Sequence, residues 1–597
     1  MDCHPAPSQT PGIRSSRTCN RMNTRSKLIV AIASFCAAKF AFALSPGETV
    51  DNFRLLDHQG GSRELYYLSD MKAVVLMAQG NGCAASRDAM PGLKSLRDQY
   101  KAQGVEVLMI DSNLPDTSAA IVKEATAAGV DIPILLDDTQ IIGESLDLRR
   151  NGEVLVINPQ GWKLAYRGPI ANAGDAVGAL VNGQPVKTAK VEMKGCPIAM
   201  PERDKQQAHA KISYAKTIAP MLIDNCVTCH RQGGIGPWQM TSYEMIKGFA
   251  PMIREVVRTE RMPPWHADPH YQAFSNDRSL SKDEVKTLVH WIEAGAPRGK
   301  GPDPLADLHK TWSEWAFGKP NMVIQVTEFD VPATGIVDYK RYVVQNTLGR
   351  DVWVRATDII PGDRTVVHHV IVGIYDPKLP ERQRMISMSS PSLGAYVPGN
   401  GPTLYPQDTG VLVRADESFA FQMHYTSSGK ATHDATRFGL YFRDAAPTYE
   451  FKTVALANPN IKIPPNTKEH AETIAQQFPR DIILYRLTPH AHFRGHASQF
   501  TAIYPDGREE LLLSVPKYDF NWQTTYTFAT PKQIPAGTKI VHTTVYDNSS
   551  QNPANPDPNR TVPWGEQSFD EMLYGVVQFR ELTPVGADVK VSSAAGK

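Results

Sequence analysis

Cys226-Val-Thr-Cys229-His230 divides a chain whose composition differs on its two sides. Covalent haem attachment requires this spacing, because two thiols add to the porphyrin vinyl groups and the adjacent imidazole ligates the iron. A thioredoxin-type redox pair and half of a zinc site are the alternatives. A thioredoxin-type redox pair normally follows a strand, and no strand pattern precedes this motif. A zinc site needs a second ligand pair, yet no cysteine follows Cys229. The motif therefore predicts one covalent haem c held by Cys226, Cys229 and His230.

Length and composition indicate several ordinary globular domains. The 597 residues suffice for roughly three to five domains of about 100 to 200 residues each. Lys and Arg total 63 and Asp and Glu total 62, so the net charge of +1 indicates no surface for nucleic acid or an anionic membrane. The 45 prolines and 42 glycines favour many turns and a β-rich architecture.

Residues 1–43 have the features of a signal peptide. A basic region precedes an apolar run over residues 28–38, and Ala41-Phe42-Ala43 is a small-x-small cleavage site. The alternative is a membrane span, but Lys39 interrupts a run shorter than the ~20 residues that a span needs. We therefore expect a periplasmic or secreted bacterial protein without a stable membrane span after cleavage. Its sparing use of cysteine fits the periplasm, where c-type haem is attached.

Residues 44–190 alternate between strand and helix patterns. Residues 73–78 and 105–110 are apolar runs typical of buried strands. Residues 91–100 are expected to form the helix between them, with Pro91 in its first turn. The region resembles a thioredoxin or peroxiredoxin-type domain, in which a reactive thiol occupies the strand-to-helix turn where Cys83 stands in Asn81-Gly82-Cys83.

Two roles are open for the Cys83 thiol. The partner cysteine that the family usually has three residues further on is Ser86 here, and Arg150-Asn151-Gly152 has no proline where the family normally keeps a cis one. Cys196, in Gly195-Cys196-Pro197, could pair with Cys83 as a structural disulfide. A catalytic thiol is the other reading, because a helix N-terminus lowers the pKa of a thiol.

Residues 205–300 are expected to form an all-α cytochrome c domain. A helix ending at Asn225 delivers the attachment motif, and the glycines at 233, 234 and 236 provide a tight loop. A capping box from Ser281 to Glu284 starts the last helix, whose apolar face would cover the haem as in small cytochromes c.

The sixth haem ligand is expected to be a downstream methionine. Met262 is our choice, because the prolines that follow it in Met262-Pro-Pro-Trp265 hold a ligating loop rigid. The competing methionines fit helical patterns and core packing better: Met240, Met245 and Met252. The nearby His266 and His270 are expected either at the surface or in contact with the residues that ligate the haem iron.

Beyond a linker at residues 297–304, the pattern changes to short strands separated by turn residues. Typical segments are residues 339–345, 352–360, 365–375, 418–425, 437–442 and 482–487. Helical periodicity is almost absent, so we expect two all-β sandwich or jelly-roll domains, at residues 315–455 and 456–585. The fold class is therefore multidomain, with an α/β thioredoxin-like domain, an all-α domain and two β-sandwiches.

Five histidines on these strands are candidate metal ligands: His368, His369, His424, His490 and His492. Successive strand side chains point to opposite faces, so His490 and His492 share a face, whereas His368 and His369 need a bulge or sharp twist to converge. Imidazole with a thioether suits copper, and this half has no thiolate for zinc. A single histidine is more often a hydrogen-bonded core or surface residue, but the joint pattern favours metal binding.

Residues 315–585 resemble the copper-dependent, ascorbate-type monooxygenases, the family of peptidylglycine α-hydroxylating monooxygenase and dopamine β-monooxygenase. The resemblance implies two copper ions. An electron-storing copper would be bound by His368, His369 and His424. An oxygen-activating copper would be bound by His490, His492 and Met572, the last in Asp570-Glu571-Met572.

Departures from that family bear on stability and substrate. This half lacks the family's disulfides, because it contains no cysteine. The peptide-amidating member's arginine two residues before His-x-His is Thr488 here, and its asparagine and tyrosine after the methionine are Tyr574 and Val576. The anchors for a peptide carboxylate are therefore missing, and peptide amidation is not expected.

These parts together suggest an exported copper-dependent monooxygenase that hydroxylates a small organic substrate with O2. The fused haem would relay single electrons from an ascorbate-like reductant or a periplasmic redox protein. An alternative is a periplasmic haem and copper electron-transfer or thiol-redox protein without hydroxylation. A third reading is a thiol peroxidase that depends on Cys83.

Overall fold

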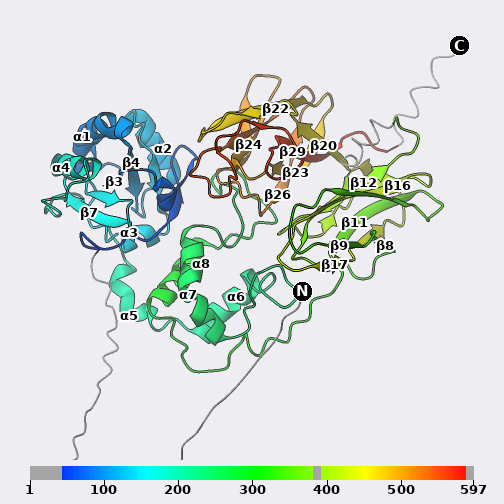
Figure 1. Ribbon diagram of the computed structural model, residues 1–597, viewed down its shortest axis with the longest axis horizontal. Helices are drawn as coiled ribbons and strands as arrows, with labels where there is room; N and C mark the ends of the chain where they lie inside the picture. Colours follow the sequence, from blue (N-terminus) through cyan, green and yellow to red (C-terminus); the bar gives the residue numbers. More distant parts are fainter. Residues whose placement is uncertain (1–43, 381–391, 586–597) are drawn as a thin grey trace, which may run out of the picture. The chain divides into compact units, whose positions relative to one another are not determined.

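Buried parallel strands organise the first domain. The computed structural model describes residues 44–380 and 392–585 (Figure 1), so the expected signal peptide lies outside the described residues. Every residue of β3 (Ala73–Gln79) is buried, and β3 pairs in parallel with β4 (Val105–Asp111). Alternate residues of β3 belong to two different apolar clusters. A strand covered on both faces needs such an unbroken apolar run.

The α/β prediction for this region is confirmed. The five-stranded sheet has the order β5-β4-β3-β6-β7, in which β6 and β7 are antiparallel to their neighbours. The remaining strands of this sheet are β5 (Ile134–Leu136), β6 (Val154–Asn158) and β7 (Lys163–Gly168). A separate hairpin precedes it and pairs β1 (Arg54–Leu56) with β2 (Ser62–Glu64). The helices are η1 (Leu65–Leu68), α1 (Ala84–Tyr100), η2 (Lys101–Gln103), α2 (Ser118–Ala127), α3 (Ile141–Ser145) and α4 (Ile170–Val181).

The helix after β3 is longer than predicted. α1 begins at Ala84, directly after Cys83 as its N-cap, and Pro91 lies inside it. The prediction that the helix starts at Pro91 is therefore wrong. An internal proline costs a helix about 3 kcal/mol, but Leu93 and Leu96 are buried with the sheet and this packing offsets the cost.

Residues 203–293 are helical and carry the cysteine motif. The elements are η3 (Arg203–Lys205), α5 (Gln206–His209), η4 (Tyr214–Ile218), α6 (Ala219–Asn225), α7 (Tyr243–Arg258) and α8 (Lys282–Glu293). The predicted end of a helix at Asn225 and the capping box from Ser281 to Glu284 are confirmed. Leu288 and Val289 of α8 lie in one apolar cluster with residues of β3.

One expectation about side chains of this region is wrong. Met245 and Met252 of α7 are 37% and 52% exposed, so they do not pack in the core, whereas Met240 is buried. His266 is buried, which excludes the surface position among the two expected for it. It belongs to a segment whose Trp265 and Phe274 pack in the apolar cluster of residues 452–581.

Residues 322–450 form a first β domain with two main sheets. One sheet has the order β10-β16-β12-β13 and contains β10 (Lys340–Gln345), β12 (Val367–Tyr375), β13 (Ser392–Tyr396) and β16 (Ser418–Tyr425). The other contains β8 (Met322–Gln325), β11 (Val352–Ile360), β14 (Thr403–Leu404), β15 (Thr409–Val413), β18 (Arg437–Phe442) and β19 (Tyr449–Glu450). A small sheet pairs β9 (Phe329–Val331) with β17 (Thr432–Asp434).

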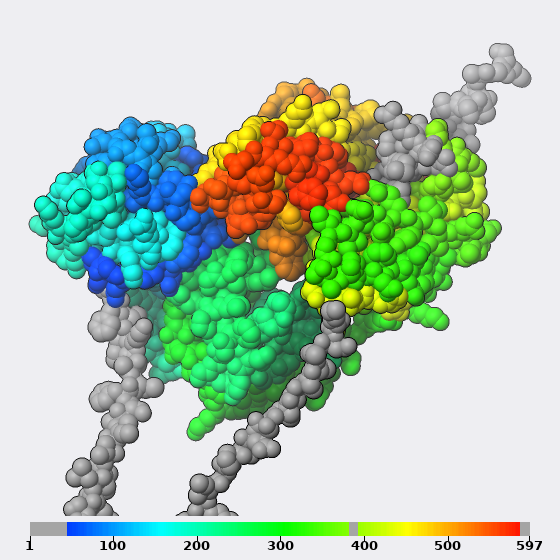
Figure 2. All heavy atoms as spheres, viewed as in Figure 1, coloured from blue at the N-terminus to red at the C-terminus, as the bar shows by residue number. Residues whose placement is uncertain are grey.

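Residues 452–581 form a second β domain of two four-stranded sheets. One contains β20 (Lys452–Ala457), β23 (Ile482–His490), β26 (Tyr526–Ile534) and β29 (Tyr574–Glu581). The other contains β22 (His470–Gln477), β24 (Gly495–Ile503), β25 (Glu509–Val515) and β27 (Lys539–Tyr546), and β21 (Lys462–Ile463) pairs with β28 (Val562–Pro563). With all heavy atoms drawn, the second β domain (yellow to red) presents a filled surface in this view (Figure 2). The prediction that this half is all-β is confirmed.

The capping box of α8 makes a measurable contribution to stability. The Ser281 side chain accepts the Glu284 N–H, and the Glu284 carboxylate accepts the Ser281 N–H. We expect Ser281→Ala to lower the free energy of unfolding by about 0.5–2 kcal/mol in urea denaturation followed by circular dichroism. Ser279→Ala, an exposed change outside the helix, serves as control and should stay within about 0.5 kcal/mol of wild type. Equal losses in both variants would contradict this reading.

Candidate metal centres

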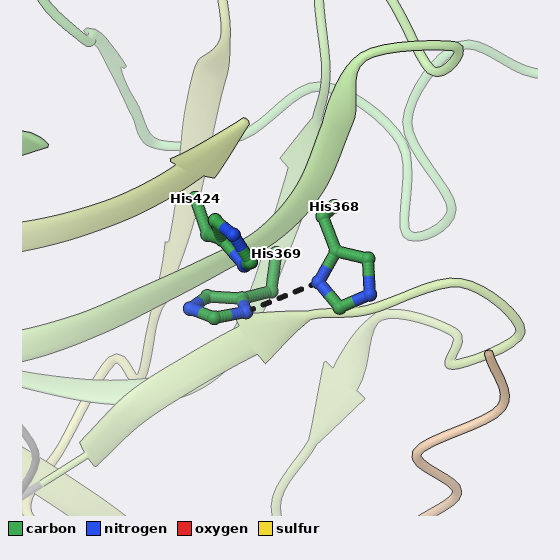
Figure 3. Close-up of side chains that lie close together, drawn as sticks. All are labelled: His368, His369 and His424. Carbon is green, nitrogen blue, oxygen red and sulfur yellow. Dashed lines mark hydrogen bonds between the residues drawn. The ribbon is translucent and has the colours of Figure 1, made fainter. Parts of the chain in front are cut away.

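Three histidines of the first β domain converge at one point (Figure 3). One ring nitrogen from each of His368, His369 and His424 lies within 4.8 Å of the other two. His368 Nδ1 and His369 Nδ1 are 3.4 Å apart. The ring centroids of His369 and His424 are 4.9 Å apart, as are those of His368 and His424. The geometry therefore offers three nitrogen ligands to one ion.

A β-bulge brings the adjacent pair together. His369 lies opposite His424 in the antiparallel pairing of β12 with β16, and the register shifts between Val367 and His369. The shift leaves His368 without a partner position in the ladder and turns its side chain toward the same side as His369. The predicted need for a bulge at these two histidines is confirmed.

These imidazoles are neutral at physiological pH and carry free nitrogens. Burial lowers the pKa of His368 to about 3 and that of His424 to about 4, and it lowers the pKa of His369 well below its usual value. His368 Nε2, His369 Nε2 and His424 Nδ1 are buried and have no hydrogen-bond partner among the described residues. A buried polar atom left unpaired costs about 1–3 kcal/mol, which a bound metal ion would relieve.

His490 and His492 of the second β domain also come together. Their ring centroids are 5.2 Å apart, although His492 lies two residues beyond the end of β23. Burial lowers the pKa of His490 to about 4 and that of His492 well below its usual value. His490 Nδ1 lies 2.7 Å from Gln523 Oε1, and His492 Nδ1 lies 3.3 Å from the Asp570 carbonyl. Both acceptors hold the proton on Nδ1 and leave Nε2 free for a metal.

Glu571 connects the backbone at His492 with the backbone at Met572 through hydrogen bonds. Its buried carboxylate accepts three backbone N–H groups, from His492 at 2.8 Å, Arg494 at 2.6 Å and Met572 at 3.2 Å. Tyr574, two residues after Met572, is the ladder partner of His490. The chain at Met572 is therefore tied to both histidines, and thioether ligation by Met572 stays a prediction.

Phe520 lies between the two histidine groups. Its ring stacks on His368 with centroids 4.8 Å apart, and it meets His492 edge-on at 5.9 Å. Tyr339 covers the first group, because its ring stacks on His424 at 4.4 Å. Sequence reasoning missed Phe520 and Gln523. The aromatic-rich stretch Tyr518-Asp-Phe-Asn-Trp522 was the available signal.

The cysteine motif forms one tight turn after α6. The N–H groups of Cys229 and His230 both donate to the Cys226 carbonyl, at 3.1 and 3.0 Å. His230 Nδ1 lies 3.0 Å from the Trp238 carbonyl, which leaves Nε2 free for iron. A Cβ at Gly236 would lie 2.7 Å from His230 Nδ1, so glycine is required there. Both thiols are free and half-buried. These features fit a covalently held haem.

The methionines near this motif differ in position. Met240 is buried and its N–H donates to the His230 carbonyl at 2.9 Å. Met262 is half-buried at the end of α7, where its N–H donates to the Val256 carbonyl at 3.2 Å. No contact between Met262 and His230 is found among the described residues, so its role as sixth ligand stays a prediction.

The two histidines after Met262 are supporting residues of the fold. Burial lowers the pKa of His266 to about 4, and its Nε2 has no hydrogen-bond partner in the described parts of the chain. His270 is exposed, and its hydrogen bond with Asp268 at 2.7 Å raises its pKa.

Cys83 and Cys196 form a disulfide in the first domain. Cys83 is buried, and the segment with Cys196 lies along the loop before β6. Asn151 N–H donates to the Cys196 carbonyl at 2.8 Å, and Arg150 forms an antiparallel bridge with Pro197. The predicted pairing is therefore confirmed, and the position of Cys83 at the N-terminus of α1 would favour its thiolate after reduction.

Comparisons with known proteins concern the thioredoxin-like part of the chain. The AhpC/TSA family matches residues 46–168. The chain is 30% identical over 115 residues to the thiol-disulfide oxidoreductase ResA of Halalkalibacterium halodurans, a match covering 19% of this chain and 64% of that relative. It is 28% identical over 119 residues to ResA of Bacillus subtilis, covering 20% and 65%. The chain thus spans less than two thirds of either relative.

Solved structures with similarity to the chain include two redox proteins. A peroxidoxin, BcpB of Mycobacterium tuberculosis, is 17% identical, with 24% of this chain and 97% of that chain covered and a TM-score of 0.21. A thiol:disulfide interchange protein of Bacteroides sp. is 18% identical, with 24% and 93% covered and a TM-score of 0.22. The family match supports a thioredoxin/peroxiredoxin-like N-terminal domain. No helix among the described residues is long and apolar enough to cross a bilayer.

Loss of the Glu571 carboxylate should destabilise the second β domain. Glu571→Ala leaves three N–H groups without their acceptor, so we expect the free energy of unfolding to fall by at least about 3 kcal/mol in urea denaturation. Glu566→Ala is the matched control. Glu566 is half-exposed and pairs only with Arg341 among its described contacts, so the loss should stay below about 1 kcal/mol. Equal midpoints for the two variants would refute the role assigned to Glu571.

Loss of the Cys83–Cys196 disulfide should also lower stability. The bond closes a loop of 113 residues, and removal of such a cross-link costs about 2–5 kcal/mol. We expect Cys83→Ser/Cys196→Ser to unfold at a lower urea concentration than the wild type. A reductant should lower the midpoint of the wild type and leave that of the double variant unchanged. A wild type insensitive to reductant would contradict the pairing.

Proposed function

We propose that the chain is an exported copper-dependent monooxygenase that hydroxylates a small organic substrate, with electrons delivered through its own c-type haem. The observation that carries the proposal is the pair of buried histidine groups joined by Phe520. All five imidazoles are neutral, and each keeps a ring nitrogen unprotonated for a metal. Such groups are costly to bury unless they bind something.

The donor set fits copper better than zinc. Each site offers imidazole nitrogen, and Met572, whose backbone is tied to that of His492 through Glu571, would add a thioether to His490 and His492. The chain beyond Cys229 contains no thiolate, which structural zinc sites commonly use. His368, His369 and His424 would hold one copper ion, and His490, His492 and Met572 would hold the other.

The proposed reaction inserts one oxygen atom of O2 into a C–H bond and releases the other as water, with two electrons and two protons consumed. Bound copper supplies one-electron chemistry and O2 activation. The protein's own residues keep the site ordered. Gln523 and the Asp570 carbonyl orient His490 and His492, and Phe520 packs against both histidine groups through His368 and His492.

A hollow beside the histidines suggests the substrate class. It has a volume of about 450 Å3 and is lined by His424 on one side and by Phe493 and Phe569 on the other. Phe493 directly follows His492, and Phe569 lies three residues before Met572. None of its lining residues carries a charge. The hollow therefore favours an uncharged substrate with an apolar body, in agreement with the missing carboxylate anchors.

Bound haem supplies electrons one at a time. A short series of contacts links the helical region that carries the motif with His490 and His492. Arg278 of this region donates to the Gly399 carbonyl at 2.6 Å. Gly399 packs so closely on Trp522 that a Cβ would lie 2.6 Å from the indole. Trp522 precedes Gln523, which binds His490. These contacts place the helical region beside the loop that orients His490, as an internal donor would require.

The environment and partners complete the proposal. A periplasmic or secreted location in a bacterium supplies O2 and suits a covalent haem and a disulfide. An ascorbate-like reductant or a periplasmic redox protein would reduce the haem. No nucleic acid is involved in this proposal, because the net charge is only +1.

A second candidate is a thiol-redox or electron-transfer protein without hydroxylation. It is supported by the AhpC/TSA match and by the Cys83–Cys196 disulfide at a helix N-terminus. This candidate predicts electron exchange that depends on Cys83 and does not consume O2.

Haem reoxidation distinguishes these functions. The haem of the full chain is reduced without oxygen, and O2 is then admitted with copper present or chelated. We expect reoxidation to be at least about tenfold faster with copper, because copper ligands and their supports change activity by that order. His492→Gln should abolish the difference, while His433→Gln, at an exposed histidine of the first β domain, should preserve it. Identical rates with and without copper would exclude the monooxygenase proposal.

A further inference from the structure

A second cluster of histidines and carboxylates lies outside the β domains. It joins Glu144 of α3, Glu202 before α5, His209 at the end of α5 and His290 of α8. Ligand atoms of Glu202, His209 and His290 lie within 4.8 Å of one another. Two segments that are distant in sequence thus place three metal-binding groups at one point, and Glu144 of a third segment lies beside one of them, His290.

Each imidazole of this cluster faces a carboxylate. His290 Nε2 is 2.7 Å from Glu144 Oε2, and His209 Nε2 is 3.2 Å from Glu202 Oε2. The two rings stack with centroids 4.1 Å apart and an interplanar angle of 6°. A metal ion lies close to the plane of each imidazole that binds it, so one ring must turn out of this stacking when both nitrogens bind the same ion.

The charges of the cluster are suited to a divalent cation. The side chains of His290, His209 and Glu144 are only 5%, 11% and 12% exposed. The second carboxylate oxygen of Glu144 is buried and has no hydrogen-bond partner among the described residues. A divalent cation bound by two neutral imidazoles would balance the charges of the two carboxylates.

We infer that Glu144, Glu202, His209 and His290 form a structural zinc site. Imidazole nitrogen and carboxylate oxygen are both zinc ligands, and four protein ligands are the normal number for a structural zinc ion. The site is independent of the proposed copper chemistry, because none of its residues belongs to the β domains.

The ion would hold the helical segment on the thioredoxin-like domain. Glu144 belongs to that domain, whereas His290 precedes the buried Trp291 in the apolar cluster shared by α8 and the sheet. Glu202 and His209 belong to the segment that connects the two parts after Cys196. Zinc would therefore crosslink the chain at the point where the disulfide-bonded segment reaches the helices.

Zinc stoichiometry tests the site. The full chain is stripped of exchangeable metal, titrated with Zn2+ against a competing chelator and assayed by elemental analysis. We expect His209→Gln/His290→Gln to bind one zinc fewer per chain than the wild type and to lose the zinc-dependent rise in melting temperature. Zinc bound at the β-domain histidines is present in both proteins, so it does not affect the difference in zinc content between the wild type and the variant.

Two further variants guard against misfolding and nonspecific loss. Glu202→Gln changes a partly exposed ligand, so it should keep the circular dichroism spectrum and weaken the same zinc by at least about tenfold. His433→Gln removes an exposed histidine that also faces two carboxylates, Asp330 and Glu328, and should bind as the wild type does. Equal zinc content and affinity in wild type, Glu202→Gln and the folded double variant would overturn the inference.

Discussion

Burial of neutral imidazoles is the constraint on which the β half depends. His368, His369 and His424 have ring nitrogens that are removed from water and given no protein partner among the described residues. Each such atom costs about 1–3 kcal/mol, a large amount beside the marginal stability of a domain. Three of these atoms gather at one bulge in an otherwise regular ladder. Unpaired polar atoms gathered at one point indicate a binding site.

His490 and His492 are positioned differently, by hydrogen bonds and not by a bulge. Their rings are oriented by acceptors on Nδ1, and Glu571 ties the backbone of His492 to that of Met572. His230 follows the same principle, because the Trp238 carbonyl holds its Nδ1 proton. One free Nε2 at each position is the common result. Phe520 then links the two histidine groups, so a single loop of the second β domain contacts both.

Local sequence patterns predicted the strands and the convergence of the histidines well. β11, β16 and β18 begin and end where alternation and turn residues indicate, and the adjacent histidine pair required the bulge that is found. Long-range packing was beyond such patterns. α1 continues through Pro91 because the sheet stabilises it, Trp265 packs in a distant domain, and Phe520 acquires its role only when its loop meets residues far away in sequence.

The thioredoxin-like domain is the part that comparisons support, and the proposed chemistry of the rest of the chain rests on the histidine groups. The account depends on those groups binding copper. The most direct measurement is the number of copper ions that the full chain retains after equilibrium dialysis, with x-ray absorption of the bound metal. The account predicts two copper ions per chain, one with nitrogen ligands alone and one with an added sulfur ligand. No retained copper, or copper with no imidazole nitrogen in its first coordination sphere, would contradict it.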